Sequence, residues 1–388
     1  MRWPSLRRPG EPHTVPWPRW GNEPQVPAHQ REPLTCHALP RAAACAGPRA
    51  CHAGNGTLVV RNHARKADAR RARTEGAAYR SAVERSRGKP RVATGLPGLD
   101  TLLRGGLRPG RVTVLAARTA MGKSMLALSI ARHCAVAAGR PALIASLEMS
   151  RFELWVRLMA AESGLSSDRI LRGLPEHERE RVRGAAEDLD RRRAPLDLGG
   201  DGSIPAVSDI AAECERASRR YGRLDLVVVD YLGLIDRSGP GLSPHSHDRA
   251  VEVAAIVEAL QKLARRFNAA VLLVEQLTRD VAERPDHRPR LGDMEHAEQL
   301  LPRAEAVIML HRDEYYIERQ SRRRYEQSPD PSVYPGHLFP RQGLPEPMVQ
   351  RAELHVSLHR HGPTGITPVA VDLSRCCFSL LPDSEGRP

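Results

Sequence analysis

Short apolar runs alternate with helix-forming stretches from residue 111 to residue 312, and this alternation limits the possible fold more than any other feature. The apolar runs are RVTVLAA at 111–117, ALIASLEM at 142–149, RLDLVVVDYLGLI at 223–235, AAVLLVEQ at 269–276 and EAVIMLHR at 305–312. The stretches 124–139, 152–164 and about 248–267 have helical periodicity. Strands that are apolar along their whole length are typical of a mainly parallel sheet covered by helices, so we expect an α/β fold. The runs LHVSLHR and TPVAVDL predict a closing hairpin.

The positive charge of the chain lies mostly before this alternating region. The formal net charge is +13, and residues 1–90 carry 17 Lys and Arg against 6 Asp and Glu, whereas residues 91–388 carry 42 against 40. The excess therefore belongs to a basic arm rather than to a basic fold. Such an arm either neutralises nucleic-acid phosphates or is a solvated disordered tail.

The composition also suggests where domains begin and end. Proline-rich runs such as TVPWPRWGNEPQVP predict a disordered Pro/Arg-rich arm over residues 1–60. Residues 61–90 predict a polar helix with little apolar face, which needs a partner to be stable. The packed domain is expected over 91–381, with a tail at 382–388. No run resembles a secretion signal or approaches 18 apolar residues, so we expect neither export nor a membrane span.

Seven cysteines are an odd number for a disulfide framework. Cys36, Cys45 and Cys51, with neighbouring histidines at 37 and 52, are an alternative zinc site, but they lack a CxxC pair. Cys376 and Cys377 are expected to pack at the end of a strand.

A phosphate-binding motif lies between the first strand and its helix. The motif has the form A-x4-G-K-S and comprises Ala117, Arg118, Thr119, Ala120, Met121, Gly122, Lys123 and Ser124. Gly122 lets the backbone turn toward a phosphate at the helix N-terminus, Lys123 reaches the β- and γ-phosphates, and Ser124 ligates Mg²⁺. Ala117 stands where the usual pattern has a glycine, which is acceptable if its φ is not positive.

Three polar residues lie at the ends of other expected strands. Asp230 has the position of a carboxylate that holds Mg²⁺, Glu148 can orient or deprotonate the attacking water, and Gln276 can sense the γ-phosphate. We expect the strand before Glu148 to lie beside the first strand. The ends of all four strands should then meet at one edge of the sheet.

Several motifs together resemble one family. TGLPGLDTLLRGGLRPGRVTVLAARTAMGKS, SLEM, VVVDYLGLI and HRHGPTG are similar to the C-terminal motor domain of DnaB-type replicative helicases, over roughly residues 91–381. The resemblance implies a RecA-like P-loop core, ATP and Mg²⁺ as cofactors, and alanine as an ordinary first residue of the loop. It also implies a homo-oligomeric ring, typically a hexamer, acting on single-stranded DNA in a bacterial or phage cytoplasm, with a loader or primase as partner. Residues 1–60 do not resemble the family's helical collar, whereas 61–90 suit its linker helix.

Three features depart from the family pattern. Arg360 matches the arginine finger that reaches a neighbour's γ-phosphate, but Leu358 replaces the family's lysine, which leaves His359 or His361 as substitutes. The run 293–299 lacks the arginine and glycine of the family's DNA loop. Other residues could contact DNA there, or form an ordinary solvated basic loop: Arg279, Arg284, Arg288, Arg290 and His296. An insertion over about 317–350, with the RRRY sequence, is expected to be a proline-rich surface loop or partner site.

These observations support three hypotheses. The first is an ATP-dependent motor that translocates on single-stranded DNA as a ring during DNA replication. The second is a DnaB-like nucleotide-binding protein that does not unwind DNA and acts as an ATP-gated assembly or regulatory factor, which Leu358 and the altered DNA loop favour. A third, a small-molecule kinase, is weakened by the lack of an evident acceptor site.

Overall fold

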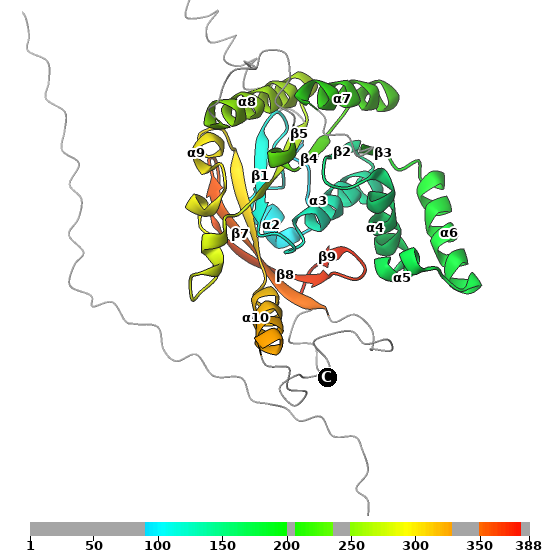
Figure 1. Ribbon diagram of the computed structural model, residues 1–388. Helices are drawn as coiled ribbons and strands as arrows, with labels where there is room; N and C mark the ends of the chain where they lie inside the picture. The colour runs from blue at the N-terminus through cyan, green and yellow to red at the C-terminus, as the bar shows by residue number, and fades with distance from the viewer. Residues whose placement is uncertain (1–89, 200–205, 236–248, 328–348, 382–388) are drawn as a thin grey trace, which may run out of the picture. The chain divides into compact units, whose positions relative to one another are not determined.

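The computed structural model describes residues 90–199, 206–235, 249–327 and 349–381 (Figure 1). The predicted arm at 1–60, its alternative zinc site and the tail at 382–388 lie outside these residues. The predicted linker helix at 61–90 lies outside them except for Pro90.

The described residues form a nine-stranded sheet with the order β3-β2-β4-β5-β1-β6-β7-β8-β9. The six strands from β3 to β6 in this order are parallel, and β7, β8 and β9 continue the sheet antiparallel. The strands are β1 (Val112–Ala117), β2 (Ala142–Ser146), β3 (Leu196–Gly199), β4 (Leu226–Asp230), β5 (Ala270–Gln276), β6 (Ala306–His311), β7 (Gln350–His359), β8 (Gly365–Asp372) and β9 (Cys377–Ser379). The predicted α/β fold and its closing hairpin, β7–β8, are confirmed.

Helices cover both faces of the sheet, with α7 and α8 on one side and α3 on the other (Figure 1). The helices are α2 (Pro97–Leu102), α3 (Lys123–Arg132) with a π-helical turn at His133–Ala137, α4 (Arg151–Ser163), α5 (Ser167–Arg172), α6 (Glu176–Arg191), α7 (Val207–Tyr221), α8 (Arg249–Phe267), α9 (Ala297–Leu300) and α10 (Asp313–Gln327). Along β4, Val228 packs into the apolar cluster on the α3 side, while Val227 and Val229 pack into the other. This alternation explains why the strand is apolar at every position.

The predicted place of β2 is wrong. β2 pairs with β3 and β4, and both β4 and β5 lie between β2 and β1. The connection from β1 through α3 to β2 crosses the positions of β4 and β5, which come later in the chain. The hydrophobic pattern of a strand does not specify its neighbours, so the sequence could not indicate this order.

The expected surface loop at about 317–350 begins as a helix. α10 runs through Gln327, while residues 328–348 lie outside the described part of the chain. The segment DEYYIERQSRRRYEQ holds no proline, and the first proline after it is Pro329, so nothing in it stops a helix.

The region between residues 165 and 222 holds helices that the sequence analysis did not predict. Helix α6 buries only Glu178 and Val182, so its apolar signal is weak. Helix α7 buries Ile210, Cys214 and Ala217, a helical spacing that was present in the sequence. Of the helices in the described ranges, none combines the length and apolarity that a bilayer span requires.

A buried side chain of the sheet should carry much more stability than an exposed one. Leu115 in β1 is completely buried, whereas Ile366 in β8 is 55% exposed. We expect Leu115→Ala to lower the free energy of unfolding by about 2–5 kcal/mol and Ile366→Ala to lower it by less than about 1 kcal/mol. Urea denaturation of both variants measures the difference, and equal losses would contradict the placement of β1.

Candidate nucleotide-binding site

The predicted phosphate loop connects the carboxyl end of β1 to the N-terminus of α3. Ala120 has φ +65° and Gly122 φ +100°, both in the left-handed region that curls a loop tightly. Ala117 ends β1 and does not have a positive φ, so no glycine is needed there. A Cβ on Gly122 would meet only ordinary contacts, the nearest being Met125 Cε at 3.5 Å. Backbone conformation, not lack of space, is therefore what requires glycine at position 122.

Lys123 is the first residue of α3 and is 6% exposed. Its Nζ lies 3.7 Å from Glu148 Oε2 and 5.1 Å from the ring centroid of Tyr231. A nearly buried ammonium at the start of a helix favours a bound anion, because the positive end of the helix dipole adds to its charge.

Hydrogen bonds fix the segment that carries Glu148. Met149 N donates to Ser146 Oγ at 3.0 Å, just past the end of β2. Ser150 and Glu153 then form a capping box at the start of α4, in which Glu153 N donates to Ser150 Oγ and Ser150 N donates to Glu153 Oε2. Glu148 itself stays about half exposed, between two anchored positions. Its carboxylate can therefore face both Lys123 and solvent.

Asp230 ends β4 and is 2% exposed, and its Oδ1 has no hydrogen-bond partner among the described residues. Burial raises the pKa of Asp230, while a hydrogen bond with Ser124 and the charge of Lys123 oppose that rise. An unpaired buried carboxylate oxygen beside a hydroxyl is a fitting ligand pair for Mg²⁺.

Gln276 ends β5, and its Nε2 donates to Thr119 Oγ1 of the phosphate loop at 2.8 Å. Main-chain pairing brings the strand ends together, because Ala117 pairs with Gln276 and Ser146 pairs with Asp230. The expected convergence of four strand ends at one edge is therefore what the structure contains, although β1 and β2 are not neighbours.

Two buried arginines anchor the phosphate loop through hydrogen bonds to main-chain carbonyl oxygens. Arg118 Nη1 donates to Leu277 O at 2.8 Å, and Arg312 Nη1 donates to Met121 O at 3.3 Å. Arg312 is 1% exposed, and burial lowers its pKa. Sequence reasoning missed Arg312. Its only signal is an arginine directly after the apolar run of β6.

The guanidinium of Arg360 is held within its own chain. It donates to the main-chain oxygens of Ala304, Leu301 and Pro302, and the residue is exposed. Leu358 is half-buried against the apolar cluster of the α8 face. The described contacts therefore place Arg360 at the 301–304 turn rather than beside Lys123 of the same chain.

His359 does not replace the missing lysine. It is 8% exposed, and its Nδ1 lies 3.1 Å from the carbonyl oxygen of Leu102. Burial lowers its pKa, so the ring is neutral near pH 7. His361 is exposed at the turn between β7 and β8.

The five candidate DNA-contacting residues do not form one basic surface. Arg284 donates to Asp293 at 2.6 and 2.8 Å, and Arg288 pairs with Glu353. These two guanidinium groups are already paired with carboxylates of the chain, so less of their charge faces a DNA strand than that of an unpaired arginine.

The other three candidates differ in exposure. His296 is 7% exposed, so little of its side chain is accessible to a DNA strand. Arg290 is exposed, 3.5 Å from Asp286, and Arg279 is exposed without an ion pair to the described residues. Arg279 and Arg290 remain as predicted DNA contacts.

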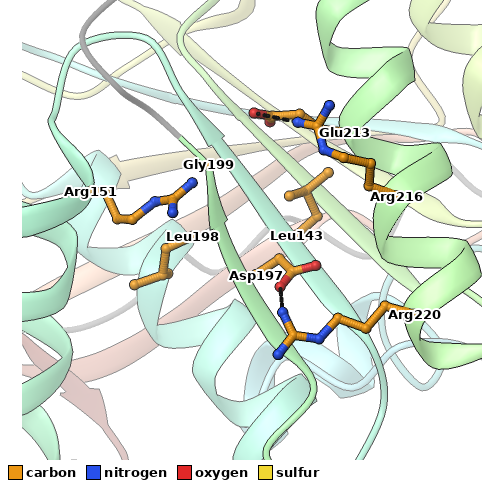
Figure 2. Close-up of a pocket in the computed structure, with 8 residues that line it drawn as sticks. All are labelled: Leu143, Arg151, Asp197, Leu198, Gly199, Glu213, Arg216 and Arg220. Atoms are coloured by element: carbon orange, nitrogen blue, oxygen red, sulfur yellow. Dashed lines mark hydrogen bonds and ion pairs between the residues drawn. The ribbon is translucent and has the colours of Figure 1, made fainter.

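A separate surface cavity of about 430 Å³ lies at the outer strand β3 (Figure 2). Its walls carry Arg151, Arg216 and Arg220, but Asp197 pairs with Arg220 at 3.2 Å and Glu213 pairs with Arg216 at 3.4 Å. None of the phosphate-loop residues lines it. The cavity is therefore not the predicted nucleotide site.

Comparison with known proteins agrees with this geometry. The model of the family described as DnaB-like helicase C terminal domain matches residues 91–379. The replicative DNA helicase DnaB of Leifsonia xyli subsp. xyli is 33% identical over 279 residues, which are 72% of this chain and 53% of that protein. The replicative DNA helicase DnaB of Geobacillus stearothermophilus is 33% identical over 226 residues, or 58% and 48% of the two chains. The chain thus spans about half the length of these curated relatives.

Two solved structures share the fold. One is a DnaB-like replicative helicase studied with its primase interactions, with TM-score 0.61, 22% identity, and coverage of 79% of this chain and 66% of that chain. The other is the ATPase domain of G40P, with the same TM-score and identity, covering 79% of this chain and 98% of that chain. The predicted RecA-like fold is confirmed.

Replacing the buried carboxylates of Asp230 and Asp225 by amides should change the stability of the protein in opposite directions. The pKa of Asp230 is raised above 3.8 in the folded protein, so folding favours the protonated carboxyl. The contribution of this group to the free energy of unfolding is therefore fully present below pH 3.8 and is lost as the pH rises through the raised pKa. We expect Asp230→Asn to raise the unfolding temperature of the nucleotide-free protein at pH 7 by a few degrees, and to do so less as pH falls toward 4.

Asp225 is the matched control, because Arg140 and Arg223 contact its Oδ2 at 3.3 and 3.1 Å and it is 1% exposed. Asp225→Asn should destabilise the protein by about 3 kcal/mol, because two arginines lose their partner. Differential scanning calorimetry at several pH values measures both effects. Destabilisation by Asp230→Asn would mean that the Asp230 carboxylate is already compensated in the fold.

Proposed function

Because the chain belongs to the DnaB-like helicase C-terminal domain family, we propose that it is an ATP-hydrolysing motor that translocates on single-stranded DNA as a ring during DNA replication. The observation that carries the proposal is the meeting of Lys123, Glu148 and Asp230 at one edge of the parallel sheet. The names of the curated relatives, replicative DNA helicases, support unwinding over a purely regulatory role.

In this proposal the phosphate loop holds the nucleotide. Main-chain N–H groups at the start of α3 face the phosphates, and Lys123 contacts the β- and γ-phosphates. Ser124 and Asp230 would hold Mg²⁺, which supplies charge neutralisation at the phosphate oxygens. The unpaired Oδ1 of Asp230 supports this assignment.

Glu148 and Lys123 form an ion pair across 3.7 Å. A γ-phosphate attracts the Lys123 ammonium more strongly than one carboxylate does, because it carries more negative charge. Glu148 is then free to orient the attacking water and to accept its proton. Gln276 adds a neutral amide at the same place and transmits the state of the loop through Thr119.

Arg360 would act on the nucleotide of a neighbouring subunit. Its three carbonyl contacts hold the side chain at an exposed position, where a neighbour in a ring could present its γ-phosphate. Leu358 removes the second cation of the family pattern, and loss of one transition-state donor costs about 3 kcal/mol. We therefore expect slower turnover than a motor with both cations.

We further propose that the chain binds single-stranded DNA, assembles as a hexameric ring and has a loader or primase as partner. Its location would be the cytoplasm of bacteria or of phage-infected cells. The predicted linker helix at 61–90 would dock on a neighbouring subunit. Arg279 and Arg290 are the residues that we propose for DNA contact.

Steady-state ATP hydrolysis of the full chain, with and without single-stranded DNA, tests the motor hypothesis. We expect DNA to stimulate turnover and Arg360→Ala to reduce it by about 10³-fold, since an arginine finger contributes on that scale. The matched control is Arg183→Ala on α6, an arginine that is 62% exposed and lies 3.6 Å from Glu176, which should leave turnover within a factor of two. ATP binding without turnover under either condition would instead favour the ATP-gated assembly role.

The site itself is tested by two substitutions. Lys123→Ala should abolish detectable nucleotide binding, because the loop loses its only cation that faces the phosphates. Glu148→Gln should keep binding and lower turnover by about 10²–10⁴-fold, since the amide cannot accept a proton. Fluorescent-nucleotide binding and phosphate release are the measurements. Normal turnover in Glu148→Gln would assign the base to another residue.

A further inference from the structure

Three ionisable side chains meet beside the nucleotide site without taking part in it. Glu275 lies near the end of β5, and Glu295 and His296 lie just before α9. One ligand atom from each lies within 4.8 Å of the others. These three residues are called the β5 cluster below.

Strand alternation places the β5 cluster on the opposite face from the phosphate loop. Gln276 reaches Thr119 on the α3 side, so Glu275 points to the side covered by α8. Main-chain bonds bring the second segment to it: Glu295 N donates to Gln276 O at 3.1 Å, and Thr278 N donates to Asp293 O at 2.7 Å. The backbone that carries the cluster is thus paired like a short strand.

Arg284 and Asp293 fix this segment further. Besides the two bonds from Arg284, Asp293 Oδ2 accepts from Arg290 N at 2.6 Å. The geometry of residues 293–296 is therefore set before any ligand arrives, as preorganised sites require. Arg284 has a positioning role here.

Two buried polar atoms of the β5 cluster, Glu275 Oε2 and His296 Nδ1, have no hydrogen bond to the described residues. Glu275 is completely buried, its Oε1 accepts from Gln276 N, and its Oε2 has no hydrogen-bond partner among the described residues. His296 Nδ1 is likewise without a hydrogen bond and lies 3.6 Å from Glu275 Oε1. A buried carboxylate in this state is costly unless a cation joins it.

We propose that Glu275, Glu295 and His296 form a divalent metal site that binds Zn²⁺ and, more weakly, Mn²⁺. One imidazole and two carboxylates are a set that Zn²⁺ accepts, whereas Mg²⁺ prefers oxygen ligands alone. Two carboxylates also balance the charge of one divalent ion. The 3.6 Å between Nδ1 and Oε1 suits two ligands that share an ion at about 2.1 Å from each.

Arg249 competes with the ion. Its Nε lies 3.3 Å from His296 Nε2, which in that contact accepts a hydrogen bond and leaves the proton on Nδ1. Metal binding through Nδ1 requires the proton on Nε2, so Arg249 must move away. Arg249 is exposed at the start of α8, which leaves room for this movement. The proposal therefore predicts tighter metal binding by Arg249→Ala.

The experiment is a Zn²⁺ titration of the full, tag-free chain after EDTA treatment, in competition with a chromophoric chelator and without nucleotide. Wild type should bind one more equivalent of Zn²⁺ than either Glu275→Gln or His296→Asn. Glu298→Gln, an exposed change in the same segment, should keep that equivalent. Arg249→Ala should bind it several-fold more tightly. Because each result is a difference between variants, binding elsewhere in the chain cancels.

A thermal readout separates metal binding from simple ion pairing. Zn²⁺ should raise the unfolding temperature of wild type by a few degrees and leave Glu275→Gln unchanged. Equal numbers of bound ions in wild type, Glu275→Gln and His296→Asn would overturn the proposal and leave a Glu275–His296 ion pair. If both variants fail to fold, lack of the expected tightening in Arg249→Ala overturns it.

Discussion

Register between neighbouring parallel strands is the constraint on which the site depends. Ser146 pairs with Asp230, and Ala117 pairs with Gln276. The ladder continues past the strands, since Leu147 N donates to Asp230 O at 2.7 Å. A shift of one residue would turn Asp230 to the opposite face, away from Ser124. Main-chain hydrogen bonds, rather than contacts between the candidate side chains, therefore bring the Asp230 carboxylate, the Gln276 amide and the predicted phosphate loop together.

Local patterns were sufficient for the fold class and for the strand–turn–helix geometry of the predicted phosphate loop. Each central strand is short and apolar on both faces, and the GKS sequence lies where a strand gives way to a helix, so both signals are contained in a few consecutive residues. The tolerance for Ala117 also followed from local geometry, because only a positive φ would have excluded it. The positions of Glu148, Asp230 and Gln276 could be anticipated because parallel strands present their carboxyl ends at one edge.

Contacts between distant segments could not be anticipated. The place of β2 depends on which strands enter later, and the hold of Arg312 on Met121 spans 191 residues. The arginines near residue 284 illustrate the same limit, because a cluster of positive charge suggested DNA. Arg284 instead meets Asp293 nine residues away, and Arg288 meets Glu353 on β7. Charge counts do not show which charges are already neutralised within the fold.

The two ends of the sheet have a consequence for self-association. The outer strand β3 has four residues and β9 has three, within the part of the chain described here. Arginines and acids surround β3, where Arg220 and Asp197 occupy the space beside the strand (Figure 2). Short, charged edges discourage further strands from pairing and so protect against aggregation. Copies of this chain would therefore associate through helices and loops, and their sheets would stay separate.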